Sequence, residues 1–309
     1  MKLQKQLTAA LAGAALFGSV ANAEIPLTDE LSAYGYIDMA LTDGDGSNDT
    51  STSVAEFELG FAFAPAESKW SAVAELSFDS DTDDVDGNGE DSSAEFETVT
   101  ISYQYSDSLS FTFGNILSYQ GFETYDATGL YQYSYAGDTS NGRNGVLYSA
   151  GYAVGASADY TTGDFDLGVW VGDTDSSEMS FEYLVAYNGV ENLTVKFIYA
   201  DDPGYETVNV WAAYDYGDFT FAVETVETES GTGADVLDIQ TALVYYAIGK
   251  AGITVRFSDG EYAGVDFEKF TISPSYSFSD NVFGLVEFSS EELGGVDNDT
   301  AAVELIYSF

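Results

Sequence analysis

The chain has 309 residues, with 53 acidic against 8 basic ones, no His, no Cys and a formal net charge of −45. The lack of His and Cys excludes Ser-His catalysis, His-metal catalysis, thiolate nucleophiles and disulfides. The acidity argues against a nucleic-acid partner, because phosphates are bound by Lys and Arg. Aromatic residues make up 15% of the chain, which is too many for an acidic disordered protein.

Residues 1–23 have the features of a secretory signal peptide. Two Lys residues form a positive start, residues 7–20 are apolar and Ala-rich, and Ala21-Asn22-Ala23 fits a small-x-small cleavage site. We therefore expect cleavage between Ala23 and Glu24, and one mature domain over residues 24–309. A membrane anchor is the alternative, but the apolar run is short and no stop-transfer pattern follows it.

Strict alternation of apolar and polar residues runs through the mature chain, as expected for β-strands with two different faces. Phe57, Leu59 and Phe61, for example, alternate with Glu58 and Gly60. The pattern predicts 16 strands. They cover residues 31–42, 53–64, 70–79, 95–105, 109–117, 147–162, 165–171, 179–187, 193–200, 206–216, 219–227, 236–247, 253–259, 266–278, 282–290 and 299–309.

Short and long connections take turns between these strands, which is typical of an outer-membrane barrel with tight periplasmic turns and longer external loops. Aromatic residues crowd the short turns, as in an interfacial girdle. The connections expected to be long or acidic are 43–52, 80–94, 118–146, 172–178, 201–205, 228–235, 260–265 and 291–298. We therefore predict an all-β fold, a transmembrane antiparallel β-barrel of about 16 strands. A secreted β-sandwich or β-helix is the alternative. It requires alternating apolar and polar residues within each strand, but not the regular succession of short and long connections.

The C-terminal residues alternate up to an aromatic end, with Val303, Leu305, Tyr307 and Phe309 on one face. This ending resembles the terminal β-signal that the barrel-assembly machinery reads, so Tyr307 and Phe309 are the expected assembly signal. An ordinary terminal strand is the alternative. Together with the signal peptide, this ending predicts insertion into the lipid bilayer of the outer membrane of a Gram-negative cell.

A barrel of this size encloses an aqueous channel, and its lipid-facing side must be apolar. Alternation then turns a set of carboxylates inward, opposed on the wall only by Lys196, Arg256 and Lys269. The inward carboxylates are expected to be Glu56, Glu58, Glu75, Asp166, Glu182, Asp215, Glu224, Glu287 and Glu304. Such a tube concentrates cations, which predicts a passive, cation-preferring channel for small hydrophilic solutes rather than an enzyme. Adaptation to a saline habitat would also explain the acidity.

Connection 118–146 is the longest and would be the third on the external side. Its aromatic and charged side chains favour a loop folded into the lumen, where it narrows the pore. The expected constriction combines Tyr119, Glu123, Tyr125, Asp126 and Arg143 from this connection with Glu56, Glu58 and Glu75 from the facing wall. The alternative is a loop that lies over the barrel mouth as a lid or a contact surface.

Residues 113–135 carry a family resemblance. Phe113-Gly114-Asn115-Ile116, Gly121-Phe122-Glu123 and Tyr133-Ser134-Tyr135 resemble corresponding segments of the OmpL-like family of outer-membrane β-barrel porins. The resemblance implies a passive outer-membrane channel, and porins of this strand count are commonly homotrimers. The chain departs from the pattern at Asn115, where a basic residue is common, and at Gln132.

The connection over residues 80–94 contains a calcium-loop pattern, D-x-[DN]-x-[DN]-G-x5-E. Its candidate ligands are Asp84, Asp86, Asn88 and Glu95. A solvated acidic loop is the alternative, because no flanking helices are expected, and no other cofactor is predicted. A competing function is a structural or surface-interaction barrel, whose acidic loops bind lipopolysaccharide through Ca²⁺ or contact other cells.

Overall fold

The computed structural model describes residues 24–44, 50–79, 93–123, 127–137, 151–173 and 178–309. Its strands are β1 (Ile25–Pro26), β2 (Leu31–Gly44), β3 (Ser51–Phe63), β4 (Trp70–Asp79), β5 (Ser93–Gln104), β6 (Leu109–Leu117), β7 (Tyr152–Thr162), β8 (Phe165–Asp173), β9 (Ser180–Tyr187), β10 (Leu193–Asp202), β11 (Tyr205–Tyr216), β12 (Phe219–Ser230), β13 (Asp235–Ile248), β14 (Ala251–Tyr262), β15 (Val265–Ser279), β16 (Val282–Leu293) and β17 (Val296–Ser308). A single-turn 3₁₀ helix, η1 (Ala127–Gly129), lies between β6 and β7. No helix in these ranges has the length and apolar character needed to cross a membrane.

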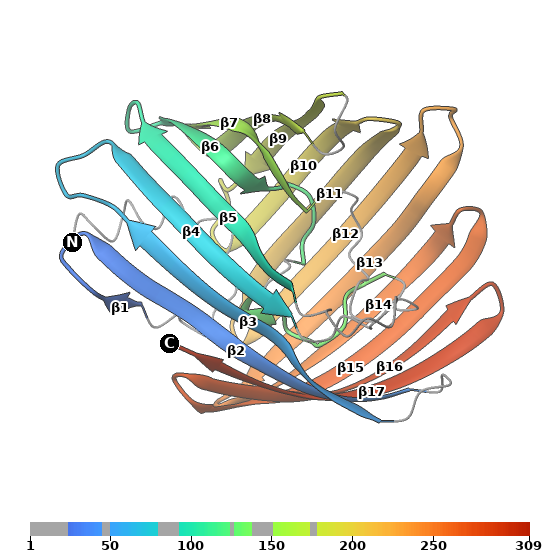
Figure 1. Cartoon of the computed structure of the whole chain (residues 1–309). Coiled ribbons are helices and arrows are strands. Elements are labelled where there is room, and N and C mark those ends of the chain that lie inside the picture. The colour runs from blue at the N-terminus through green and yellow to red at the C-terminus, as the bar shows by residue number, and fades with distance from the viewer. Residues whose placement is uncertain (1–23, 45–49, 80–92, 124–126, 138–150, 174–177) are drawn as a thin grey trace.

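Strands β2 to β17 form a closed antiparallel ring of sixteen (Figure 1). Each strand pairs with its neighbour in sequence, and β17 returns to pair with β2 from Thr300 to Ser308. Closure removes the open sheet edges, whose unpaired N–H and C=O groups are costly in a bilayer. The predicted all-β barrel of 16 strands is therefore confirmed.

Most predicted strand positions agree with the observed ones to within a few residues. The strand expected over 147–162 begins at Tyr152 in the structure, and residues 147–150 lie outside the described ranges. Strand β1 was not predicted, because two residues are too few to show a period. It pairs with β2 at Ser32 and Ala33.

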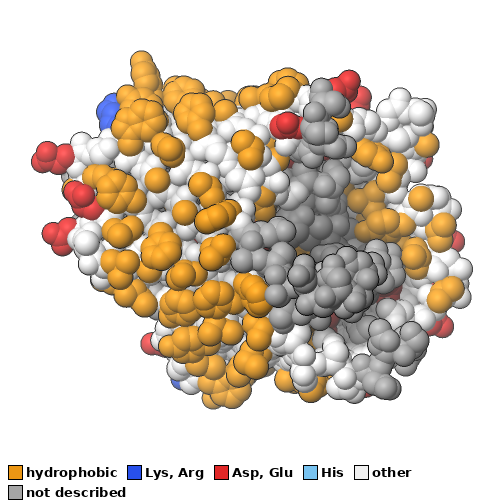
Figure 2. Space-filling model, viewed as in Figure 1, with side chains coloured by type: hydrophobic (Ala, Val, Ile, Leu, Met, Phe, Trp, Pro, Cys, Tyr) orange, Lys and Arg blue, Asp and Glu red, His pale blue; other side chains and the backbone are white. Residues whose placement is uncertain are grey.

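The two faces of each strand differ as alternation predicts. On β12, Phe219 and Phe221 are exposed, whereas Thr220 and Glu224 are buried. Hydrophobic side chains cover much of the outer wall in Figure 2. The ring therefore turns its apolar residues outward and many of its polar residues inward, the reverse of a soluble domain and the pattern of a barrel in lipid.

Aromatic residues pack beside the short turns. Phe219 stacks on Tyr246, with 4.4 Å between the ring centroids, and Phe165 lies 5.1 Å from Tyr187. The turns themselves are tight: Gly163 and Gly217 have φ angles of 60° and 62°, a conformation that glycine adopts without strain. The aromatic crowding predicted from the sequence is thus present at this end of the barrel.

Four of the connections expected to be long or acidic are tight turns instead, namely 201–205, 228–235, 260–265 and 291–298. Only Ala263 and Gly264 separate β14 from β15, and only Gly294 and Gly295 separate β16 from β17. Both residues of each pair have positive φ, as in the type I′ turns of two-residue hairpins. The acidic residues on either side stay in the paired strands, because polar side chains are compatible with a hairpin that extends into water.

The chain end completes the seam of the ring. Gly35 and Phe309 exchange two backbone hydrogen bonds, each with a nitrogen–oxygen distance of 2.9 Å. Val303, Leu305 and Tyr307 are exposed on the outer face, as the alternation predicts. The reading of Tyr307 and Phe309 as an assembly signal stays a prediction.

Candidate pore constriction

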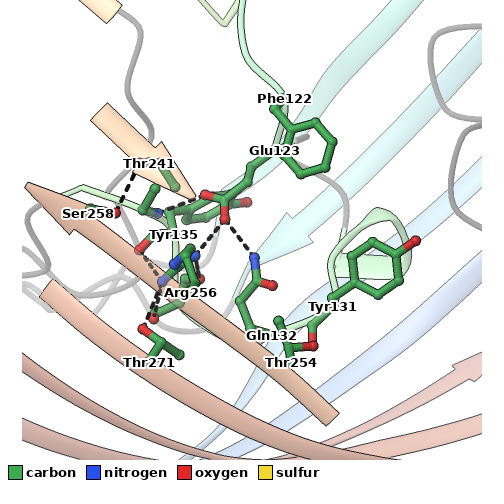
Figure 3. Close-up of polar contacts among 12 residues, drawn as sticks. Phe122, Glu123, Tyr131, Gln132, Tyr135, Thr241, Thr254, Arg256, Ser258 and Thr271 are labelled. Atoms are coloured by element: carbon green, nitrogen blue, oxygen red, sulfur yellow. Dashed lines mark hydrogen bonds and ion pairs between the residues drawn. The ribbon is translucent and has the colours of Figure 1, made fainter. Parts of the chain in front are cut away.

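Residues 118–123 and 127–137, together called segment 118–137, follow β6 and contact the buried face of the wall (Figures 1 and 3). The Ser118 amide first donates to the Gly151 carbonyl, which continues the pairing of β6 with β7. At Gly121 the chain turns with φ of 89°, and the Gly121 amide donates to Asn209 Oδ1 at 2.9 Å. The chain therefore leaves β6 through a glycine turn that a wall side chain holds in place.

Three wall carboxylates accept hydrogen bonds from backbone N–H groups of this segment. Glu182 on β9 accepts from the Tyr119 amide at 2.7 Å, and Glu224 on β12 accepts from the Phe122 amide at 3.0 Å. Glu287 on β16 accepts from the amides of residues 133 and 134, at 2.8 Å and 3.2 Å. Hydrogen bonds to an ionised acceptor are about twice as strong as neutral ones, so these acids act as fixed supports for the segment.

An ion pair between Arg256 and Glu123 lies at the centre of the contact (Figure 3). Arg256 Nη1 lies 2.5 Å from Glu123 Oε1, and both side chains are buried. Glu123 also accepts from Gln132 Nε2 at 2.6 Å and from the Ala136 amide at 2.7 Å. The carboxylate therefore joins two stretches of the segment to strand β14, which is far away in sequence.

Basic and hydroxyl groups of the wall hold the carbonyl oxygens of the same segment. The two terminal nitrogens of Arg256 donate to the carbonyls of Ser134 and Tyr135, at 2.7 Å and 2.6 Å. Lys269 Nζ donates to the Tyr135 and Gly137 carbonyls, at 2.8 Å and 2.9 Å. The wall thus matches donors to carbonyls and acids to amides, as buried backbone groups require.

Aromatic contacts accompany these polar ones. Phe122 packs edge-on against Trp211, with ring centroids 5.5 Å apart. Tyr131 lies 4.5 Å from Tyr245. Aromatic side chains, which are frequent in this part of the sequence, therefore pack the segment onto the wall.

Tyr119 and Tyr131 lie outside the membrane-spanning strands, and both have a raised hydroxyl pKa. Burial is the main cause for each. Asp159, which accepts the hydrogen bond of Tyr119, raises the pKa of that hydroxyl further. Both groups therefore stay protonated at neutral pH and can donate hydrogen bonds.

The structure places the predicted site residues in two groups. Tyr119 and Glu123 are bound to the wall of β7, β9 and β14. Glu56 and Glu58 are buried on β3, and Glu75 on β4 accepts from the Tyr34 hydroxyl at 2.5 Å. The predicted residues Tyr125, Asp126 and Arg143 lie outside the described residues.

The predicted calcium ligands Asp84, Asp86 and Asn88 also lie outside the described residues, as does the side chain of Glu95. A different acidic group is present: one carboxylate oxygen each from Glu56, Glu58 and Glu97 lies within 4.8 Å of the others. Carboxylate oxygens are the ligands that Ca²⁺ prefers, although acidic groups of this kind are common without an ion.

Sequence reasoning missed several functional partners. It placed Arg256 and Lys269 on the wall as charges opposing the acids, whereas the structure shows them bound to the segment. It also gave no role to Asn209 or Thr254, which hold Gly121 and Tyr131. One signal was present, since an Arg that alternation turns inward must find acceptors when it is buried.

No model of a known protein family matches the sequence, and no curated protein matches it. Solved structures do match. OmpT of Vibrio cholerae, an outer-membrane protein, has a TM-score of 0.67 at 12% identity, over 93% of this chain and 100% of that one. The chain has the fold of the outer-membrane porins.

Two further structures have the same fold. An anion-selective porin from Comamonas acidovorans has a TM-score of 0.67 at 14% identity, over 90% of this chain and 99% of that one. A triple mutant of the Rhodopseudomonas blastica porin has a TM-score of 0.66 at 19% identity, over 90% and 100%. These structures are described as porins or outer-membrane proteins, not as enzymes, and this chain is a porin-like barrel.

Proposed function

We propose that the protein is an outer-membrane porin, with a water-filled channel for passive diffusion of small hydrophilic solutes and a preference for cations. One observation carries this proposal: a closed ring of sixteen strands keeps charged side chains on its buried face and apolar ones outside. Sixteen strands leave an aqueous channel rather than a packed core. The porin fold of the matching structures also supports a water-filled channel.

In this proposal, segment 118–137 lies in the lumen and narrows the channel. Its hydrogen bonds to Glu182, Glu224, Arg256 and Glu287, which lie on four different strands, support that position. The full constriction comprises Tyr119, Glu123, Tyr125, Asp126 and Arg143 with Glu56, Glu58 and Glu75. A lid over the mouth would have no need of acceptors so far around the wall.

The balance of buried charge supports the cation preference. Among the described residues, the buried acids are Asp38, Glu56, Glu58, Glu123, Glu182, Asp202, Glu224, Glu287, Glu291 and Glu304, and the buried basic residues are Arg256 and Lys269. Both basic side chains donate to carbonyl oxygens of the segment. Unit charges about 8 Å apart interact by roughly 0.5 kcal/mol in bulk water and roughly 2 kcal/mol at an effective dielectric constant of 20, so several acids together repel anions appreciably.

The same proposal covers the export, assembly and membrane insertion of the protein. Residues 1–23 are removed as a signal peptide at Ala23/Glu24, the assembly machinery reads the C-terminal end, and the barrel inserts into a Gram-negative outer membrane as a homotrimer among lipopolysaccharide. The OmpL-like resemblance agrees with this assignment. The residues that carry it, Gly121-Phe122-Glu123 and Tyr133-Ser134-Tyr135, include those that the wall holds. External acidic loops, including Asp84, Asp86, Asn88 and Glu95, would attract Ca²⁺.

Conductance in planar bilayers tests the function. Purified folded protein should give stepwise current increases, and a KCl gradient should give a zero-current potential of the sign that K⁺ permeation produces. Liposomes that contain the protein should also swell in solutions of small sugars. Folded protein that inserts without conductance would instead favour the structural or surface-interaction barrel.

A further inference from the structure

Tyr119 lies directly over Gly168 on the buried face of β8. A Cβ atom added to Gly168 would lie 2.8 Å from Tyr119 Cζ and 2.9 Å from its hydroxyl oxygen, closer than carbon atoms pack. No side chain larger than hydrogen therefore fits at this position while the Tyr119 ring stays where it is. The close approach explains a glycine in the middle of a strand, where it otherwise weakens pairing.

Other groups fix the same tyrosine. Its hydroxyl donates to Asp159 Oδ1 at 2.6 Å, and Asp159 on β7 is the cross-strand partner of Gly168. The second oxygen of Asp159 accepts from Ser157 Oγ at 3.0 Å. The Tyr119 backbone amide donates to Glu182. The ring, its hydroxyl and its backbone are thus all held at the point where the segment leaves β6.

We propose that Gly168 and Asp159 form a seat for Tyr119, and that this seat sets how closely the start of segment 118–137 lies against the wall. The three are positioning residues. The inference rests on the proposed function for its effect on the channel: a ring held flat on the wall leaves more of the lumen open, and a ring pushed off the wall obstructs it.

A series of variants at the seat tests the effect on the channel. Gly168→Ala should lower the single-channel KCl conductance by roughly a fifth, because conduction follows the space that the pore leaves open, and Gly168→Val should lower it further. In a Tyr119→Ala background, Gly168→Ala should change nothing more, because the two groups act through one contact. Gly189→Ala is the matched control. Its added Cβ meets the Tyr187 ring outside the segment, so its conductance should equal that of the wild type.

A second readout follows the position of the segment without any channel activity. The chain has no Cys, so Gln120→Cys supplies a single thiol beside Tyr119, at a position that is 4% exposed. N-ethylmaleimide should label this thiol slowly in the parent and several-fold faster with Gly168→Val. The mobility of unheated samples in SDS gels checks that each variant is folded.

Conductance and thiol labelling together distinguish a failure of the seat from a failure of the proposed function. Faster labelling in the folded Gly168→Val variant supports the seat even if the wild-type barrel does not conduct, which would contradict only the proposed function. Unchanged labelling in that folded variant overturns the seat, as does an undiminished effect of Gly168→Ala in the Tyr119→Ala background.

Discussion

Carboxylates on two sides of the barrel wall are arranged differently. On β9, β12 and β16, Glu182, Glu224 and Glu287 each accept hydrogen bonds from backbone amides of segment 118–137. On β3 and β5, one carboxylate oxygen each of Glu56, Glu58 and Glu97 lies within 4.8 Å of the others. The same residue type on the same face therefore has two uses: one set holds the segment, and the other concentrates negative charge.

This difference shows that the number of charged side chains on a barrel wall does not give the electric field that acts on a passing ion. A carboxylate that accepts two N–H groups has its field compensated by their dipoles. A group of adjacent carboxylates has a summed field, which attracts cations into a water-filled tube. We therefore assign the proposed cation preference to the side of β3–β5 and the fixed position of the segment to the side of β9–β16.

Arg256→Ala should have the largest effect on stability. It leaves Glu123 buried without its cation, a change that costs about 3–5 kcal/mol for a broken buried ion pair. The temperature at which the barrel unfolds in SDS should fall, and the segment should become accessible to protease. Lys250→Ala, at an exposed turn, is the control, and equal behaviour of the two variants would contradict the role assigned to Arg256.

Glu224→Gln should have a smaller effect. The amide keeps one acceptor oxygen but loses the charge that strengthens the bonds from Phe122 and Asn209, at a cost of about 1–2 kcal/mol. Thermal unfolding measures this cost. Glu227→Gln, on the exposed face of the same strand, should leave the unfolding temperature unchanged. A larger loss for Glu227→Gln would contradict the division of the two faces.

A rise in salt concentration should affect the two sides of the wall differently. The Debye length falls from about 10 Å at 0.1 M to about 3 Å at 1 M, so the cation preference should weaken over that range. The buried pair of Arg256 and Glu123 is screened much less, and the unfolding temperature should change little. A selectivity that is constant with salt would show that the carboxylates of β3 and β5 do not control it.

The sequence predicted the ring because alternation is a local property that can be read within one strand. The strand expected over 219–227 is present, and only its extension to Ser230 was missed. The turn at Gly294 and Gly295 was misread, because acidic residues on both sides suggested a loop, whereas backbone pairing continues up to the glycines.

The site could be predicted only in part, because its contacts are long-range. The sequence predicted Glu123 as a constriction residue, but its partner Arg256 is 133 positions away, and no local period connects them. The seat of Tyr119 on Gly168 depends on a backbone approach that sequence spacing does not reveal. Alternation tells which face a side chain occupies, not which segment lies against it.

The zero-current potential in a KCl gradient at low salt, compared between Glu56→Gln/Glu58→Gln and Glu224→Gln, tests the central claim most directly. We expect the first variant to lose much of the cation preference without a fall in unfolding temperature. The second should keep the preference but unfold more easily. Wild-type anion selectivity, or equal potentials for the wild type and Glu56→Gln/Glu58→Gln, would contradict the assignment of selectivity to β3–β5.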